Sequence, residues 1–359
     1  MPQQGADVNG QRLLETTAAL CRIPSPTGFT RAATDFVASR FDALGLEVRR
    51  TIKGSLVVEL PGGDRGAGHR TLSAHIDTLG AMVKEIKPNG RLKLIRIGGY
   101  DWATIEGEYC TVHTAPGTAG PSGITGTILT TKASFHIHAQ ALVDLRRDGD
   151  SLEVRLDAAV RTAEEVKALG VAVGDFVSFD PRTVLTEDGF LKSRHLDDKA
   201  AVAILLEVAC AVVEGGAPLT APTHLYVSTF EEVGHGSSAG LPVGTTELVA
   251  IDMAAVGDGQ TSDEFAVTVC VKDSSGPYDH GLSRHLVDIA VEHGIDCRVD
   301  IYPTYASDVS QALRAGYDVR GALVGPGVDA SHSFERLHRR SLEETTRLLL
   351  AYLGSPPGR

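Results

Sequence analysis

The sequence has little positive charge for its size. Its 359 residues contain 34 lysines and arginines against 46 aspartates and glutamates, which gives a formal net charge of −12. Proteins that bind nucleic acid or anionic lipid present a basic face to the phosphates, and this composition disfavours such a face. We therefore expect neither a nucleic-acid partner nor a membrane partner.

The chain also lacks a long apolar run. The longest, "AAVAILLEVACAVV" at Ala200–Val213, is interrupted by Glu207 and falls short of the roughly 20 residues that a membrane-spanning helix needs. The first residues, "MPQQGADVNGQ", lack the basic and apolar regions of a secretory signal. These two features predict a cytoplasmic protein.

Cysteines are few and scattered along the chain. The five cysteines form no Cys-x-x-Cys pair and are odd in number, which is not the pattern of a disulfide framework or a thiolate metal site. Buried, reduced thiols are the usual state of such cysteines in a cytoplasmic protein. We expect that state here rather than a catalytic cysteine.

Helix-spaced and strand-like segments alternate at both ends of the chain. Strands that alternate with helices predict a mostly parallel sheet covered on both faces. The apolar spacing predicts helices at about 9–22, 30–45, 198–214, 281–293, 305–315 and 341–353, and strands such as "SLVVEL", "TLSAHID", "THLYVSTF", "ELVAIDM", "FAVTVCVKD", "CRVDIY" and "RGALVGP".

The middle of the chain has a different texture. From about 78 to 190, short apolar runs such as "RLKLIRI", "GEYCTVH", "GTILTT", "FHIHAQALVDL" and "SLEVRLDA" follow one another between Gly, Pro or Asp. That pattern predicts an all-β region with one helical segment, "TAEEVKALG". The chain is therefore expected to form one α/β domain from residues 1–77 and 191–359, with a β-rich domain inserted at 78–190.

Metal-type ligands occur where several of the outer strands end. Ligands in open α/β sheets bind at the carboxyl ends of the strands, so these side chains are expected to meet. They are His75 and Asp77 in "LSAHID", Asp197 and Asp198 in "HLDDK", Glu231 and Glu232 in "STFEE", Asp252 in "VAIDM" and His332 in "ASHSFE".

Each of these motifs taken alone has a more common structural explanation. A His-x-Asp is more often a surface or core pair, an Asp-Asp before a helix is more often an N-cap, and a Glu-Glu is more often part of a solvated loop. Their joint occurrence at the strand ends of one sheet favours a metal site. Imidazole mixed with carboxylate suits Zn²⁺, Co²⁺ or Mn²⁺.

The number of ligands predicts two metal ions rather than one. A single catalytic Zn²⁺ takes about three protein ligands, whereas two ions about 3.5–4 Å apart share a carboxylate in aminopeptidase-type sites. In "STFEEVGHGSS" the strand must end for both glutamates to serve one site. One of them can then hold a metal while the other takes a proton from a metal-activated water and passes it to the leaving amine.

Longer segments extend these single motifs. They are "AHIDTLGAMVKEIKPNGRLKL", "GVAVGDFVSFD", "HLDDKAAVAILLEVA", "FEEVGHGSSAG", "VAIDMAAVGD", "VKDSSGPYDH" and "SHSFE". In this order they resemble the M42 family of co-catalytic metallo-aminopeptidases, which includes glutamyl and tetrahedral aminopeptidases. The resemblance implies a phosphorylase/hydrolase-like α/β sandwich with an inserted PDZ-like or β-barrel dimerisation domain.

The resemblance also implies roles for the strand-end residues. By position, His75, Asp197 and Asp252 would hold one metal, and Asp197, Glu232 and His332 the other, with Asp197 as the bridge. Glu231 would be the general base and acid, and Asp77 would orient His75. Two divalent ions per chain are implied, with zinc expected first and cobalt or manganese as alternatives.

Other implications concern assembly and substrate. The family builds dimers and, from them, tetrahedral cages. Lys199 stands where the family has arginine, and "GPGVDASHSFE" lacks the family's usual arginine, tyrosine and proline before and after the last histidine. "YDWATIEGEYCTVHT" and "LTTKASFHIH" resemble a bacterial branch found in gene clusters for the osmolyte N-acetylglutaminylglutamine amide.

The expected function is a dinuclear aminopeptidase that removes N-terminal residues from short peptides. An alternative keeps the chemistry but acts on an acylated or amidated small metabolite, and more remote ones are a glycoside hydrolase with paired carboxylates and a non-catalytic scaffold. Substrate contacts are expected from His235, His195 and Asp308. His136 and His138, placed on one face of a strand, are expected to be half-exposed; alternatively, one reaches a neighbouring subunit's active site.

Overall fold

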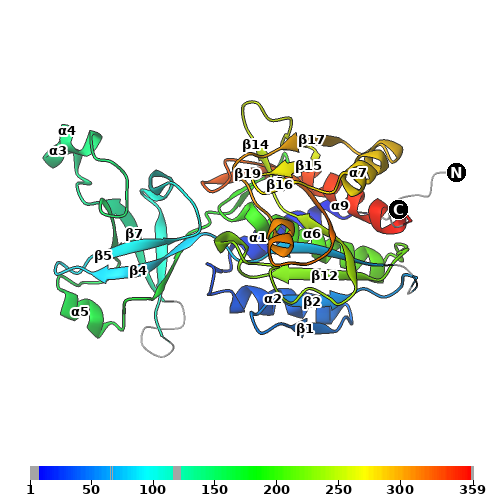
Figure 1. The fold of residues 1–359 in the computed structure, drawn as a ribbon. Coiled ribbons are helices and arrows are strands. Elements are labelled where there is room, and N and C mark those ends of the chain that lie inside the picture. The colour runs from blue at the N-terminus through cyan, green and yellow to red at the C-terminus, as the bar shows by residue number, and fades with distance from the viewer. Residues whose placement is uncertain (1–7, 65, 67, 116–122, 357–359) are drawn as a thin grey trace.

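A large sheet covered by helices lies beside a smaller closed barrel in the computed structural model (Figure 1). The structure describes residues 8–64, 66, 68–115 and 123–356. No helix within these residues is long and apolar enough to cross a membrane. The architecture is the α/β sandwich with a barrel that the sequence predicts.

The centre of the large sheet is parallel and its margins are antiparallel. Strands β12, β3, β13 and β18 pair in parallel, while β2, β15 and β19 join antiparallel, so the sheet is mixed. Within the described residues it has 13 strands. The main path is β1 (Val48–Arg50), β2 (Leu56–Glu59), β12 (Thr223–Ser228), β3 (His69–His75), β13 (Thr245–Ile251), β18 (Arg320–Asp329), β19 (Glu335–His338), β11 (Phe190–Ser193) and β10 (Val184–Leu185), with β14 (Ala254–Val256), β15 (Val267–Asp273), β16 (Gly276–Pro277) and β17 (Cys297–Ile301) branching from it.

Both faces of the sheet are buried, as the continuous apolar runs predict. In β13, Val249 and Ile251 join one core cluster while Leu248 and Ala250 join another on the opposite face. Alternate side chains of a strand point to opposite faces, so a strand covered on both sides reads as uniformly apolar. The first cluster is covered by α1 (Gly10–Cys21), α2 (Arg31–Ala43), α6 (Leu196–Val213), α7 (His280–Glu292) and α9 (Arg339–Gly354), and the second includes α8 (Asp308–Arg314).

The smaller region is a closed barrel with its own core. Its strands follow the order β4 (Gly80–Ile86), β5 (Leu92–Ile97), β8 (Leu152–Leu156), β7 (Ile124–Thr130), β6 (Tyr109–His113) and β9 (Phe176–Phe179). The helix α5 (Ala163–Ala168) lies in the predicted segment "TAEEVKALG" and has a capping box between Thr162 and Glu165. Closure leaves no free sheet edge along these strands.

One predicted strand of the middle region is wrong. "FHIHAQALVDL" forms two short helical turns, α3 (Phe135–His138) and α4 (Gln140–Val143), which project from the barrel away from the large sheet (Figure 1). The alternation of Phe135 and Ile137 with histidines imitates a strand, but these two side chains are 61% and 75% exposed. Their pattern therefore carries no information about a buried sheet face.

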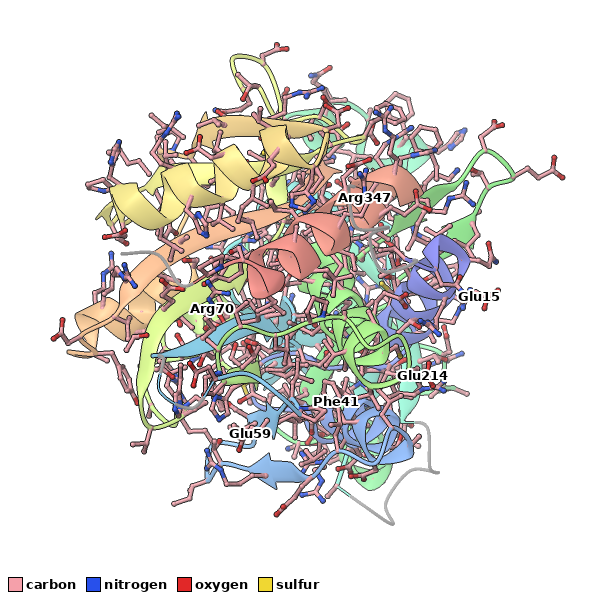
Figure 2. All side chains as sticks on the ribbon, turned by 90° about the vertical axis from the view of Figure 1, so that its right-hand side faces the viewer. Glu15, Phe41, Glu59, Arg70, Glu214 and Arg347 are labelled. Carbon is pink, nitrogen blue, oxygen red and sulfur yellow. The ribbon has the colours of Figure 1, made fainter. Side chains whose placement is uncertain are left out.

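A buried arginine stabilises the end of the central strands that lies away from the barrel. Arg70 at the start of β3 donates to a Glu247 carboxylate oxygen at 3.0 Å and to the Tyr352 carbonyl at 2.7 Å. Figure 2 views the molecule from this end of the strands and labels Arg70 beside the C-terminal helix α9. Polar groups at this end of β3 therefore serve packing, and the opposite end of the same strand carries His75.

Candidate active site

Each predicted ligand lies just past the end of a central strand or at the start of α6. His75 ends β3, and Asp252 follows the last residue of β13. β12 ends at Ser228, and the short 3₁₀ turn η2 (Glu231–Val233) then carries both glutamates, so the strand does end before the pair. His332 lies in the loop between β18 and β19.

These side chains form two groups that share one residue. The ligand atoms of His75, Asp197 and Asp252 lie within 4.8 Å of one another, as do those of Asp197, Glu232 and His332. We call them the first triad and the second triad. They are the two sets that the family resemblance implies.

Asp197 faces one imidazole with each of its carboxylate oxygens. Its Oδ1 lies 3.0 Å from His75 Nε2, and its Oδ2 lies 3.3 Å from His332 Nε2. The remaining carboxylates stand further out, with Asp252 4.0 Å from His75 Nε2 and Glu232 3.7 Å from His332 Nε2. A carboxylate that presents its two oxygens to two sites is the arrangement needed for a shared ligand.

Both histidines use the same nitrogen for support. Nδ1 of His75 lies 2.9 Å from the main-chain carbonyl of Asp77, and Nδ1 of His332 contacts the carbonyl of Gly99. A carbonyl can only accept, so Nδ1 carries a proton in both rings, and Nε2 is the nitrogen that faces Asp197 in the cluster. Carbonyl support of this kind fixes the tautomer of a metal-binding histidine.

The Asp77 carboxylate mainly holds the glutamates. Its oxygens accept the main-chain N–H groups of Glu231 at 3.1 Å and Glu232 at 3.3 Å, and the hydroxyl of Thr27 at 2.7 Å. One oxygen is 3.6 Å from His75 Nδ1, further than the Asp77 carbonyl. Asp77 thus contacts His75 through its main chain and fixes both glutamates through its side chain.

Two further carboxylates hold ligand main chains. Glu335 accepts the N–H of His332 at 3.1 Å and that of Asp197 at 3.2 Å, and Asp198 accepts the N–H of His75 at 3.1 Å. Asp198 could be identified from the sequence because it is paired with Asp197. Glu335 stands in the quoted "SHSFE", but its role could not be predicted, because main-chain N–H groups bind a carboxylate whatever the type of the residues that donate them.

Gln311 contacts Glu231 and was not expected. Its Nε2 donates to the Glu231 carboxylate at 2.6 Å and to the Glu231 carbonyl at 3.0 Å, while its Oε1 accepts the N–H of Gly236. The side chain is buried in α8. A single glutamine within a helix has no sequence feature that would indicate this role.

Burial of several carboxyl groups together makes the site electrostatically unfavourable without cations. Burial raises the pKa of Glu232 to about 8 and, with repulsion from Asp197, that of Asp252 to about 7. Burial raises the pKa of Glu231 well above its usual range. Burial would raise the pKa of Asp197 too, but hydrogen bonds from His332 and His75 outweigh it and hold that pKa below its usual range.

The residues fit divalent ions. Imidazole nitrogens and carboxylate oxygens are the ligands that zinc, cobalt and manganese accept. Among the described residues, the buried Glu232 Oε1 has no hydrogen-bond partner, as expected of an oxygen that serves a cation. Positive charge between the two triads would also allow their carboxyl groups to ionise together.

The residues expected to contact substrate lie outside the two triads. The exposed His235 stacks on Phe230, with ring centroids 4.9 Å apart. Asp308 accepts the N–H of Ser237 and the hydroxyl of Ser228, so its carboxylate holds the loop after the glutamates. His195 lines a small cavity beside Asp197, and burial lowers its pKa to about 3.

Comparison with known proteins gives the family. The sequence model of the family described as M42 glutamyl aminopeptidase matches residues 54–348. A protein of Bacillus subtilis (strain 168) named as a candidate aminopeptidase, YhfE, is 47% identical over 346 residues, which are 96% of this chain and 98% of that protein. The chain therefore belongs to the M42 aminopeptidases, which are metal-dependent enzymes that hydrolyse peptide bonds.

Solved structures share the fold. Aminopeptidase APDkam598 of the archaeon Desulfurococcus kamchatkensis superposes with a TM-score of 0.84 at 21% identity, covering 96% of this chain and 95% of that one. The TET1 peptidase of Pyrococcus horikoshii, which can assemble into a tetrahedron or a large octahedral shell, gives a TM-score of 0.82 at 22% identity, covering 95% and 99%. The α/β sandwich with its barrel is thus the fold of these enzymes.

Proposed function

We propose that the protein is a dinuclear aminopeptidase that removes N-terminal residues from short peptides. The observation that carries the proposal is the geometry of Asp197, whose two oxygens each face one histidine at 3.0 and 3.3 Å. The first triad would hold one ion and the second triad the other. Metal ions held there lower the pKa of a water molecule and polarise the scissile carbonyl.

Glu231 is the proposed proton carrier. It belongs to neither triad, yet it lies beside them, with Asp77 on its main-chain N–H. It takes a proton from the attacking water and delivers it to the leaving amine. The Gln311 amide leaves one carboxylate oxygen of Glu231 engaged and the other free to face the substrate.

Zinc is the proposed native ion, because its preferred ligands include both imidazole and carboxylate. Cobalt and manganese are alternatives with overlapping ligand preferences. Within the family, an aspartate at position 252 goes with aminopeptidases more than with carboxypeptidases. The cytoplasm is the proposed location.

The proposed assembly is a homo-oligomer built from dimers through the inserted region 78–190. Support comes from the shared fold with the TET1 peptidase of Pyrococcus horikoshii and from apolar side chains on the projecting turn α3. Phe135 and Ile137 would be covered by a second copy of the chain. Light scattering of the native chain and of an Ile137→Asp variant tests this, because the substitution should lower the oligomer mass.

The function is tested by metal content together with a substrate panel. Purified protein should contain two divalent ions per chain, lose activity on chelation and regain it with Zn²⁺, Co²⁺ or Mn²⁺. It should hydrolyse aminoacyl-anilides and short peptides with free amino termini. Hydrolysis of N-acylated amides alone would instead establish the small-metabolite alternative.

Chelation also separates the remote alternatives from the proposal. A glycoside hydrolase that uses only paired carboxylates would keep its activity after metal removal. A non-catalytic scaffold would show no turnover under any metal condition. Either result would refute the two-metal aminopeptidase.

A further inference from the structure

The second triad is supported from the barrel as well as from the large sheet. The carbonyl that accepts Nδ1–H of His332 belongs to Gly99, 233 residues away in the chain. Gly98 and Gly99 follow directly after β5 of the barrel. In the first triad, by contrast, His75 rests on the carbonyl of Asp77 in its own strand segment.

Gly98 lies against the other terminal ligand of the second triad. Its φ is +78°, and a Cβ at this position would lie 2.4 Å from Leu79 Cδ2 and 3.5 Å from Glu232 Oε2. A side chain would therefore have to displace the end of Leu79, and it would touch the Glu232 carboxylate at an ordinary contact distance. The positive φ favours glycine at this position.

The Gly98–Gly99 turn is fixed to the barrel. The next residue, Tyr100, is buried, and its hydroxyl donates to the Gly80 carbonyl at 3.0 Å. Its ring packs edge-on against Phe179 at a centroid distance of 5.6 Å. The turn therefore moves with the barrel wall.

A second link joins the loop of His332 to the same region. Arg194 donates to the Ser333 carbonyl at 3.1 Å and to a Glu108 carboxylate oxygen at 3.0 Å. Arg194 also contacts the carbonyl of Thr104. Glu108 and Thr104 lie just before β6 of the barrel, so His332 sits in a loop held by both parts of the molecule.

We propose that the Gly98–Gly99 turn of the barrel is a positioning element of the metal centre that sets the affinity of the second triad. Gly99 aims Nε2 of His332, and the positive φ of Gly98, which glycine adopts without strain, holds the turn in place beside Glu232. The barrel is then part of the catalytic apparatus as well as an assembly module. This inference rests on the two-metal function proposed above.

The test compares two glycines of the barrel region that both have a positive φ. Chelator-treated native protein, Gly98→Ala and Gly174→Ala are titrated with Co²⁺ in a calorimeter, with His332→Ala and Asp252→Ala as references for loss of the second and the first ion. Loss of outer support typically weakens metal binding about 10- to 100-fold. Gly98→Ala should weaken, by that factor, the binding event that is lost in His332→Ala and leave the other event unchanged.

Gly174→Ala provides the matched control. Gly174 lies just before a barrel strand and also has a positive φ, +98°, but a Cβ there meets no atom within 4 Å and the residue belongs to neither triad, so both binding events are expected to stay near native affinity. If circular dichroism shows that Gly98→Ala does not fold, Tyr100→Phe replaces it, because loss of the hydrogen bond to the Gly80 carbonyl loosens the same turn. Weaker Co²⁺ binding by the second triad is expected in Tyr100→Phe too.

Three results would count against the inference. Two Co²⁺ events of native affinity in Gly98→Ala, or in Tyr100→Phe where that variant takes its place, would overturn it. Equal weakening of both events would overturn it as well, because a selective effect is required. A native chain that binds a single ion would refute the two-metal function itself, which this titration reveals before any variant is compared.

Discussion

The two triads share Asp197 but are built differently. The first is buried, with the His75 side chain 3% exposed, and all of its members come from strand ends or the start of α6. In the second, His332 is 38% exposed, has a φ of +63° and sits in a loop that the barrel supports. An ion in the first triad would depend on the large sheet and α6, whereas an ion in the second would also depend on how two regions meet.

Removing the shared ligand is expected to have the largest effect. Asp197→Ala takes one ligand from each triad, so both ions should be lost. Metal catalysis is worth several kcal/mol of transition-state stabilisation, or about a thousandfold or more in rate. Elemental analysis and peptide hydrolysis measure the loss, and retention of even one tightly bound ion would contradict a shared Asp197.

Removing the proton carrier should separate chemistry from metal binding. Glu231→Gln is expected to lower kcat about 10²- to 10⁴-fold, the usual contribution of general acid–base catalysis. Metal content should stay at two ions, since Glu231 belongs to neither triad. Wild-type turnover with normal metal content would refute the assignment of Glu231.

Partial chelation should distinguish the two triads directly. The half-exposed His332 and its loop predict faster dissociation of the ion in the second triad. A timed treatment with a chelator should therefore yield a one-metal species, and His332→Ala should resemble it in metal content and residual rate. Simultaneous loss of both ions from the native chain would remove the distinction between the triads.

The pH dependence of metal binding is expected to differ between the triads. A carboxyl group whose pKa is raised is protonated below that pKa and must release the proton to hold a cation, so affinity falls as pH falls through it. Glu232 has its pKa raised to about 8 by burial and Asp252 to about 7. Co²⁺ titrations between pH 6 and 8.5 should show the second triad weakening first on acidification.

A histidine adds to this pH dependence in both triads. Burial lowers the pKa of each ring, but hydrogen bonds to Asp197 and, for His75, to Asp77 outweigh burial, so the pKa of His75 is raised well above its usual range and that of His332 to about 11. Each ring must then release a proton when an ion binds, so the difference between the triads rests on Glu232 and Asp252. Affinities that do not change over this range would contradict both statements.

The smallest effect is expected at the projecting turn of the barrel. His136→Ala and His138→Ala should each keep native kcat/KM, because both residues lie in the exposed turn α3 and in neither triad. A drop of tenfold or more in either variant would instead indicate that one histidine reaches the active site of a neighbouring subunit. The assay uses the native oligomer, so such a contribution would be visible.

Much of the sheet and the ligand set could be predicted because both depend on local pattern. Uniform apolar runs such as "ELVAIDM" mark strands covered on both faces, and polar ligands directly after them mark the carboxyl edge. The strand prediction for Phe135–His138 was wrong, because four residues are too few to distinguish a helical period from an alternating one. Its exposed side chains also removed the burial on which periodicity depends.

By itself, the sequence determined which ligand-type residues stand at the strand ends, since these follow from the order of residues, and the fold brings them together in two triads. Only the tertiary structure decided how these residues are held. Asp77 binds the main chain of the glutamates, Glu335 binds that of Asp197 and His332, and Gly99 supports His332 from the barrel. Apart from the contact between Glu335 and His332, these contacts join distant segments, and all of them use main-chain N–H or C=O groups, which all residue types carry except proline, which lacks the N–H, so no pattern in the sequence could reveal them.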